Sequence, residues 1–130
     1  MNTPELSTSV STRGPVLIVG TGLLGTSLAL ALRAAGVEVQ LADTSPTSLA
    51  LARDMGAGAL HGKDSPEPQI VVVATPPDVT ADVVVAQLSA HPSAVVTDVA
   101  SVKERVVNEV RSRAGAEARR YVGSHPMAGR

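Results

Sequence analysis

Short apolar runs alternate along the chain with longer segments in which apolar residues recur at helical spacing. Continuous apolar runs of roughly four to eight residues are typical of strands that are buried on both faces. Such strands are expected at residues 16–19, 37–42, 57–60, 70–74, 94–97 and 120–122. Between them, apolar side chains that return every three or four residues predict helices. These helices are expected at residues 22–35, 46–55, 77–89 and 101–114.

The order of these elements predicts an α/β fold. Strands and helices alternate in two β-α-β-α-β halves, which is typical of a parallel sheet covered by helices on both faces. Two such halves predict a Rossmann-type, doubly wound parallel sheet with six strands in the order 3-2-1-4-5-6. This dinucleotide-binding domain is expected to occupy residues 15–130. Residues 1–14 are rich in Ser and Thr and are expected to form a disordered N-terminal tail.

Composition narrows the possible functions. The formal net charge is −1 and Tyr121 is the one aromatic residue, so the clustered basic charge and stacking rings of a nucleic-acid surface are missing. The chain has no cysteine, and its three scattered histidines do not form the pattern of a metal site. It contains neither a run of about 18 apolar residues nor a basic segment followed by an apolar one at its start. We therefore expect a cytoplasmic protein without nucleic-acid, metal or membrane binding.

A glycine-rich turn, GTGLLG, follows the first expected strand and opens the first expected helix. In this setting the G-x-G-x-x-G pattern is a fingerprint of dinucleotide binding. Gly20 permits the tight turn, Gly22 lets a pyrophosphate approach the backbone, and Gly25 lets the helix pack closely against the strand. The amides of Leu23 and Leu24 are expected to face the phosphates at the helix N-terminus. The alternative is a purely structural turn.

Asp43 ends the second expected strand, 18 residues after Gly25. Its carboxylate can accept hydrogen bonds from the adenosine ribose and would repel the 2′-phosphate of NADP. No Lys or Arg lies in residues 44–51 to reverse this preference, so NAD is the expected cofactor and NADP the less favoured one. Thr44 and Ser45 could still hydrogen-bond a phosphate. Asp43 could also cap the helix that follows it.

The carboxyl ends of the later strands are expected to face the cofactor too, because ligands of open α/β sheets bind at that edge. Ala74, Thr75 and Pro76 follow the fourth expected strand and are expected beside the ribose and nicotinamide. The alternative is that the prolines of this segment only stop the strand and start the next helix. Asp98 follows the fifth strand and is expected to contribute to the cofactor site or to cap the following helix.

Ser101 and His125 follow the fifth and sixth expected strands, and neighbouring strands bring such loops together. A serine hydroxyl can hydrogen-bond an imidazole and fix its orientation. His125 could then accept the proton of a substrate hydroxyl while a hydride leaves the same carbon. The other histidines, His61 and His91, lie in polar or proline-containing loops and are expected at the surface.

Two segments carry a resemblance to a known family. The sequences TDVASVK at 97–103 and VGSHPMAG at 122–129 resemble the two signature segments of prephenate and arogenate dehydrogenases. The glycine turn and the segment Ala-Thr-Pro at 74–76 agree with it, so that the resemblance covers about residues 15–130. Lys103 belongs to the first segment, although it could also be a solvated residue of the first helical turn.

The resemblance implies an NAD-dependent prephenate dehydrogenase. This oxidoreductase converts prephenate to 4-hydroxyphenylpyruvate by oxidative decarboxylation, in tyrosine biosynthesis. His125 would accept the hydroxyl proton, and Ser101 would orient its ring. The alternatives are an arogenate dehydrogenase, another NAD(P)-dependent hydroxy-acid or imine dehydrogenase, and a regulatory domain that senses NAD without chemistry.

The family also has a second, mostly helical domain, which supplies dimer contacts and cationic residues for the substrate carboxylates. The sequence ends at Arg130, before such a domain. We therefore expect these residues to bind NAD but to be catalytically incomplete. The longer protein is expected to be a homodimer through that domain.

Overall fold

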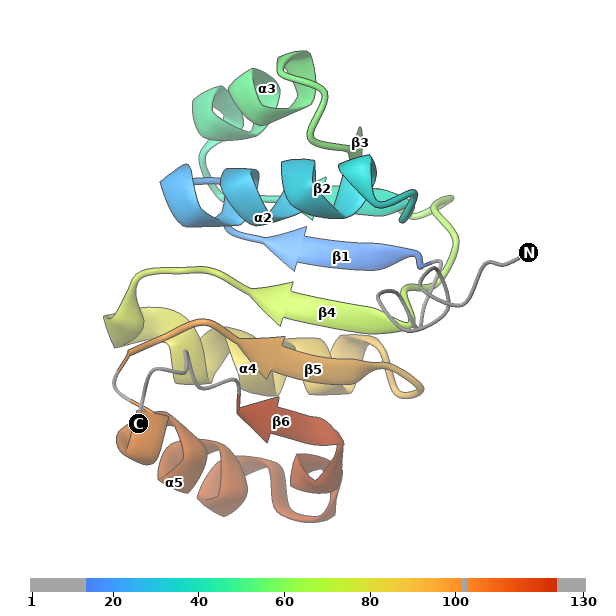
Figure 1. Ribbon diagram of the computed structural model, residues 1–130. Helices are drawn as coiled ribbons and strands as arrows, with labels where there is room; N and C mark the ends of the chain where they lie inside the picture. Colours follow the sequence, from blue (N-terminus) through green and yellow to red (C-terminus); the bar gives the residue numbers. More distant parts are fainter. Residues whose placement is uncertain (1–13, 102, 124–130) are drawn as a thin grey trace, which may run out of the picture.

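A parallel sheet of six strands lies at the centre of the computed structural model, which describes residues 14–101 and 103–123 (Figure 1). The strands are β1 (Val16–Val19), β2 (Val39–Ala42), β3 (Ala59–Leu60), β4 (Ile70–Val73), β5 (Val95–Asp98) and β6 (Tyr121–Gly123). Their order is β3-β2-β1-β4-β5-β6, and all neighbours are parallel. The predicted fold class and strand order are therefore confirmed. The tail predicted at 1–14 lies, apart from Gly14, outside the described residues.

Helices cover both faces of the sheet, and Figure 1 shows α2 and α4 on opposite sides of it. The helices are α2 (Leu23–Ala34), α3 (Pro46–Asp54), α4 (Pro77–Ala90) and α5 (Lys103–Ala114), and a 3-10 helix η1 (Gly115–Arg120) precedes β6. Each element begins within about two residues of its expected position, but η1 was not predicted. Gly115, with a φ of 60°, follows α5 in the left-handed conformation that commonly ends helices.

The hydrophobic core has two halves because successive strand residues point to opposite faces. On β1, Leu17 packs with buried residues of α4 and α5, whereas Val16 and Ile18 pack with buried residues of α2 and α3. The two central strands, β1 and β4, are buried on both faces almost throughout. Their continuous apolar sequences are the reason that these strands could be recognised.

Arg120 connects the last part of the chain to the end of α4. Its guanidinium donates hydrogen bonds to the carbonyl oxygens of Leu88, His91 and Ala94, at 2.7, 3.0 and 2.9 Å. These carbonyls lie at or just beyond the C-terminus of α4, where backbone acceptors lack helical partners. Arg120 also pairs with Glu117 at 2.6 Å.

The prediction that both remaining histidines lie at the surface is wrong for His91. This residue is buried, and its Nδ1 lies 2.9 Å from Oε1 of Glu67. His61 is partly buried, and its Nδ1 lies 2.7 Å from Oε1 of Gln40. The two imidazole rings meet edge to face, with their centroids 5.5 Å apart. Loop segments that are polar in sequence thus form a packed histidine pair.

Candidate functional site: a cleft at the carboxyl ends of the strands

A cleft of about 880 Å³ opens at the carboxyl ends of β1 and β4, where the winding of the sheet reverses. Ligands of doubly wound sheets bind at this kind of position. The residues predicted from sequence that line the cleft are Gly20, Gly22, Leu23, Leu24, Asp43, Ala74, Thr75, Pro76 and Ser101. Ser48, Val79 and Val83 also line it and were missed. The two valines of α4 could have been found, because their i, i+4 spacing places them on one helix face.

The glycine turn joins β1 to α2, and its three glycines meet different surroundings. Gly20 has a φ of 107°, and a Cβ there would lie 2.5 Å from the carbonyl oxygen of Ala74. A Cβ on buried Gly25 would clash with the carbonyl oxygen of Gly20. By contrast, a Cβ on Gly22 would meet nothing within 4 Å. The first and third glycines are therefore needed for packing, whereas the second leaves open space beside the cleft.

The N-terminus of α2 faces this open space without a side-chain cap. Gly22 is its N-cap residue, and no side chain accepts a hydrogen bond from the first turn. Leu23 and Leu24 follow with side chains that are 88% and 58% exposed. Uncapped amides and the positive end of the helix dipole favour an anionic group. These features fit a pyrophosphate, as the sequence predicted.

Asp43 lies at the end of β2 and is tied to the glycine turn. Its Oδ2 accepts hydrogen bonds from the backbone N–H and the hydroxyl of Thr21, at 2.6 and 2.7 Å, and its Oδ1 accepts one from the Ser45 N–H at 2.8 Å. Partial burial acts to raise the pKa of Asp43, but these hydrogen bonds outweigh it and hold the pKa below its ordinary value. The side chain therefore carries a negative charge at neutral pH.

The alternative that Asp43 caps α3 is wrong. Ser45 is the N-cap residue, and its hydroxyl accepts a hydrogen bond from the Ser48 N–H at 3.2 Å. The carboxylate is thus left to face the turn and the cleft.

The opposite wall of the cleft combines a polar loop with apolar helix residues. Pro76 lines the cleft and is also the N-cap residue of α4, which begins at Pro77. The segment therefore starts the helix and also lines the cleft, whereas its place beside the ribose and nicotinamide stays a prediction. The hydroxyl of buried Thr80 donates to the Pro76 carbonyl at 3.0 Å and lies 3.3 Å from the Thr75 hydroxyl. These contacts hold the loop against the start of the helix.

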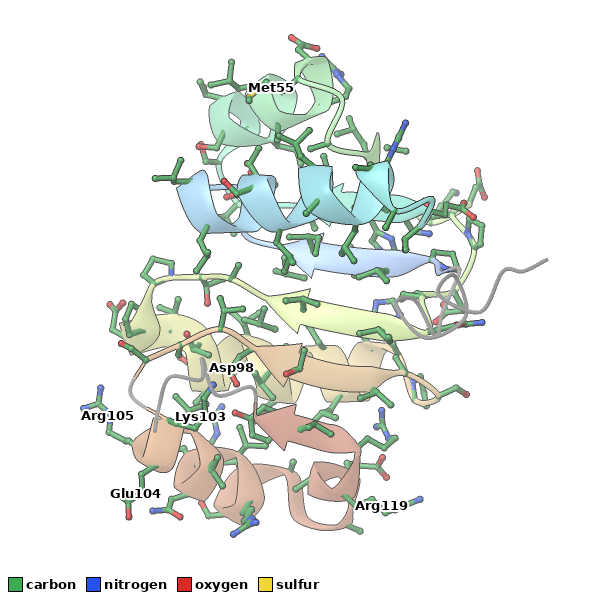
Figure 2. All side chains as sticks on the ribbon, viewed as in Figure 1. Met55, Asp98, Lys103, Glu104, Arg105 and Arg119 are labelled. Carbon is green, nitrogen blue, oxygen red and sulfur yellow. The ribbon has the colours of Figure 1, made fainter. Side chains whose placement is uncertain are left out.

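Asp98 does not line the cleft, although it was predicted to contribute to the cofactor site. Its side chain is completely buried beneath the loop that carries Ser101. The carboxylate accepts hydrogen bonds from the Ala100 N–H at 2.9 Å, from Nζ of Lys103 at 2.7 Å and from the hydroxyl of Tyr121 at 2.5 Å. Figure 2 shows Lys103 at the start of α5, below the end of β5 where Asp98 lies. Because only 8% of Lys103 is exposed, the alternative of a solvated lysine is wrong.

Burial raises the pKa of the Tyr121 hydroxyl, and the hydrogen bond to Asp98 and its negative charge raise it further. The hydroxyl therefore remains a hydrogen-bond donor throughout the range in which proteins are stable.

Ser101 is exposed at the nicotinamide end expected for the cleft. Its predicted partner, His125, lies outside the described residues, so their pairing stays a prediction. The structure does place β6 beside β5, with Gly123 paired to Asp98. The loop of Ser101 and the chain that leads to His125 thus leave adjacent strands at the same edge of the sheet.

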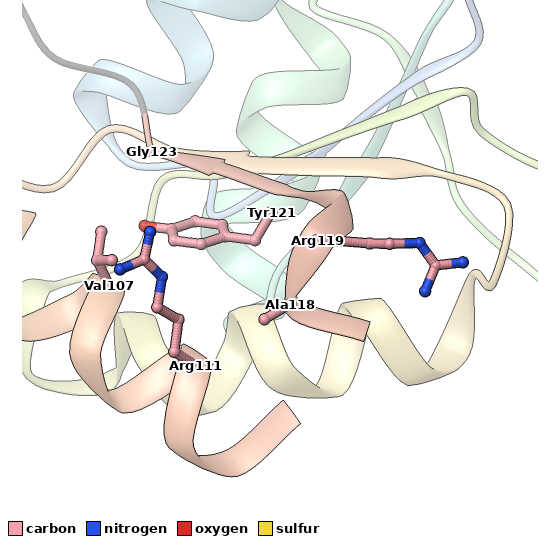
Figure 3. Close-up of a pocket in the computed structure, with 6 residues that line it drawn as sticks. All are labelled: Val107, Arg111, Ala118, Arg119, Tyr121 and Gly123. Atoms are coloured by element: carbon pink, nitrogen blue, oxygen red, sulfur yellow. The ribbon is translucent and has the colours of Figure 1, made fainter. Parts of the chain in front are cut away.

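A smaller cavity of about 330 Å³ lies between α5, η1 and β6 (Figure 3). Its lining includes Arg111, Arg119 and Tyr121. Arg111 extends from α5 toward the hydroxyl end of Tyr121, whereas Arg119 points away from the tyrosine, so the two cations do not converge on one ligand. Within residues 14–101 and 103–123, no three His, Asp or Glu side chains gather closely enough to hold a metal ion. None of the helices in this part of the chain has the length and apolar character that a bilayer-spanning helix requires.

The strand order and the cleft at β1 and β4 define a dinucleotide-binding domain of the Rossmann type. Residues 28–130 match the family described as "Prephenate dehydrogenase, nucleotide-binding domain", and the chain belongs to this family. The family match supports a nicotinamide cofactor, in agreement with the glycine turn.

Relatives and solved structures agree with the family. A probable prephenate dehydrogenase, NovF, from Streptomyces niveus is 40% identical over 115 residues, which are 88% of this chain and 31% of the relative. The crystal structure of a putative prephenate dehydrogenase from Corynebacterium glutamicum is similar with a TM-score of 0.71 and 33% identity, covering 88% of this chain and 37% of the other. Synechocystis arogenate dehydrogenase gives a TM-score of 0.70 and 27% identity, over 86% of this chain and 40% of the other. The chain spans about a third of the length of the curated relatives it matches.

Proposed function

We propose that the chain is the NAD-binding part of a prephenate dehydrogenase, which converts prephenate to 4-hydroxyphenylpyruvate by oxidative decarboxylation. The observation that carries this proposal is the continuous cleft from the uncapped start of α2 to Ser101, in a chain of this family. NAD, when bound, supplies the hydride acceptor. The residues of the chain bind the cofactor, hold the substrate hydroxyl and receive its proton.

The glycine turn and Asp43 support cofactor binding in complementary ways. Gly22 leaves room for the pyrophosphate, and the amides of Leu23 and Leu24 would donate hydrogen bonds to it. The Asp43 carboxylate lines the cleft and is ionised, so its oxygens are hydrogen-bond acceptors at the ligand site. It can accept a hydrogen bond from a ribose hydroxyl, whereas its negative charge opposes a 2′-phosphate. We therefore propose NAD rather than NADP.

The cofactor preference can be tested by titrating the protein with NAD and NADP. The unsubstituted protein should bind NAD more tightly than NADP. Asp43→Asn should reduce the ratio of the two dissociation constants, because it removes the charge of the side chain and keeps its shape. Glu38→Gln is the matched control, since it removes one exposed carboxylate just before β2 and outside the cleft. Equal affinities for the two cofactors in the unsubstituted protein would refute the preference.

The proton step is assigned to His125, with Ser101 as the residue that orients it. Ser101 lies at the end of the cleft, and the chain continues from β6, the neighbour of β5, to His125. A neutral imidazole in this place can accept the hydroxyl proton near pH 7. Loss of the hydride and of carbon dioxide then leaves an aromatic ring, which makes the reaction strongly favourable.

The decisive assay offers prephenate and arogenate, each with NAD and with NADP, to the full-length gene product and follows formation of the reduced cofactor. We expect turnover with prephenate and NAD. His125→Asn should lose most of this turnover and keep its NAD affinity. Turnover confined to arogenate would instead favour an arogenate dehydrogenase, as the similarity to the Synechocystis enzyme allows. NAD binding without turnover of either substrate would favour the sensing domain and contradict the proposal.

A further inference from the structure

One buried carboxylate, that of Asp98, joins three separate parts of the chain at the Ser101 end of the cleft. Its Oδ2 accepts hydrogen bonds from the Ala100 N–H in the β5–α5 loop and from Nζ of Lys103 in the first turn of α5. Its Oδ1 accepts the hydrogen bond of the Tyr121 hydroxyl on β6. The loop, the helix and the edge strand therefore share a single acceptor group.

Stability alone is a weak explanation for such a group. Taking two charges out of water costs several kcal/mol for each ion, and apolar replacements are often as stable as a buried ion pair. Asp98 is 0% exposed and Lys103 is 8% exposed, and no other Asp, Glu, Lys or Arg among the described residues is buried. Their bonds are directional, so they hold the three parts of the chain in a defined relative position.

The same cluster reaches the last described residue of β6. A Cβ on Gly123 would lie 3.1 Å from Cδ of Lys103 and 3.5 Å from the hydroxyl oxygen of Tyr121. The chain continues from Gly123 through Ser124 to His125. The strand that leads to the predicted proton acceptor is therefore packed directly on the cluster that holds the Ser101 loop.

We propose that Asp98, with Lys103 and Tyr121, is the positioning centre of the site, which holds the Ser101 loop in register with the strand that leads to His125. The proposal rests on the proposed function and adds residues that touch neither substrate nor cofactor. Asp98 acts on Ser101 through Ala100, and it acts on β6 through Tyr121. Neither action requires contact with the cleft.

Tyr121→Phe is the variant that tests this role with little risk to folding, because it removes one oxygen and keeps the ring. Thr97→Val is its matched control. The hydroxyl of Thr97 donates to the Val122 carbonyl and so provides the other side-chain bond between β5 and β6. Both variants remove one hydroxyl from the same pair of strands, but only the first removes a bond to Asp98.

The first measurement is amide hydrogen exchange, which does not depend on activity. Tyr121→Phe should speed exchange of the Ala100 amide, which lies in the loop after the neighbouring strand β5, by roughly tenfold. Thr97→Val should leave exchange at Ala100 within about twofold of the unsubstituted protein. Equal exchange at Ala100 in the two variants would overturn the proposal.

The second measurement is turnover of prephenate with NAD by the full-length gene product. Tyr121→Phe should lower kcat by roughly tenfold and leave the KM for NAD unchanged, since the glycine turn is untouched. Thr97→Val should keep its kcat. A kcat for Tyr121→Phe equal to that of the control would also overturn the proposal. Absence of turnover in the unsubstituted protein would count against the proposed function, and the exchange comparison would then decide this inference on its own.

Discussion

Gly22→Val should separate cofactor binding from folding. Gly22 has a φ of −72° and a ψ of −161°, which any residue can adopt, and an added Cβ would meet nothing within 4 Å. Valine is a poorer N-cap residue than glycine, so a loss of up to about 1 kcal/mol in the free energy of unfolding is expected. The fold should otherwise be preserved, because the new side chain projects into open space.

The effect on binding should be much larger. The valine side chain would occupy the space beside the uncapped amides at the start of α2, where the pyrophosphate is expected. Hydrogen bonds to charged groups contribute about 1.5–3 kcal/mol each. Loss of the two bonds from Leu23 and Leu24 would therefore weaken binding by about 3–6 kcal/mol, or roughly 10²- to 10⁴-fold.

Titration of NADH fluorescence, with thermal unfolding measured on the same samples, tests both statements. Gly62→Val is the matched control, because a Cβ there also meets nothing within 4 Å but the residue lies outside the cleft. Gly25→Ala provides the opposite case, since its Cβ would clash with the Gly20 carbonyl oxygen and should cost about 1–3 kcal/mol of stability or more. A folded Gly22→Val protein with unchanged affinity would refute the assignment of the glycine turn.

Two further predictions concern stability. Arg120→Met should lower the free energy of unfolding by about 2–4 kcal/mol in urea titrations, because three carbonyl oxygens near the end of α4 lose their donor. Arg119→Met removes an exposed arginine that has one local hydrogen bond to the backbone, so it should change the free energy of unfolding little. An equal loss of stability in the two variants would contradict this explanation. Burial, followed by the nearby His91, lowers the pKa of His61, so the unfolded chain binds more protons there and stability should decline as the pH falls below about 6.5. Between pH 7.5 and 5.5, the Tm of His61→Gln should therefore fall less than the Tm of the unsubstituted protein. An equal fall in both proteins would show that His61 is not the cause.

Local patterns in the sequence were enough to predict the fold. The strands β1 and β4 are buried on both faces, so every position is apolar and the runs stand out. Two β-α-β-α-β halves then leave few possible topologies, since parallel crossovers have a fixed hand. The glycine turn could be placed in the same way, because its function depends on a short segment whose neighbours, strand and helix, were already recognised.

Interactions between distant segments could not be predicted in this way. His91 looked like a loop residue, but it is buried and its ring contacts Glu67, 24 positions away. Arg120 was expected to begin the last strand, but it ends η1 and binds carbonyl groups 26 to 32 positions away. In both cases the side chain is polar and the burial arises from tertiary contacts, about which local sequence carries no signal.

The segment from Asp98 to Lys103 shows the same distinction at the site itself. Asp98 was expected at the cofactor site, Ser101 as the residue that orients His125, and Lys103 as part of the family signature, but only Ser101 lines the cleft. The two charged residues turn toward each other and toward β6, away from the cofactor space. Only two residues separate Asp98 from Ser101, and the Ala100 amide between them is bound to the Asp98 carboxylate. A charge at the end of β5 can therefore govern the reaction without touching it, which is why substitutions at Asp98 should change kcat more than cofactor affinity.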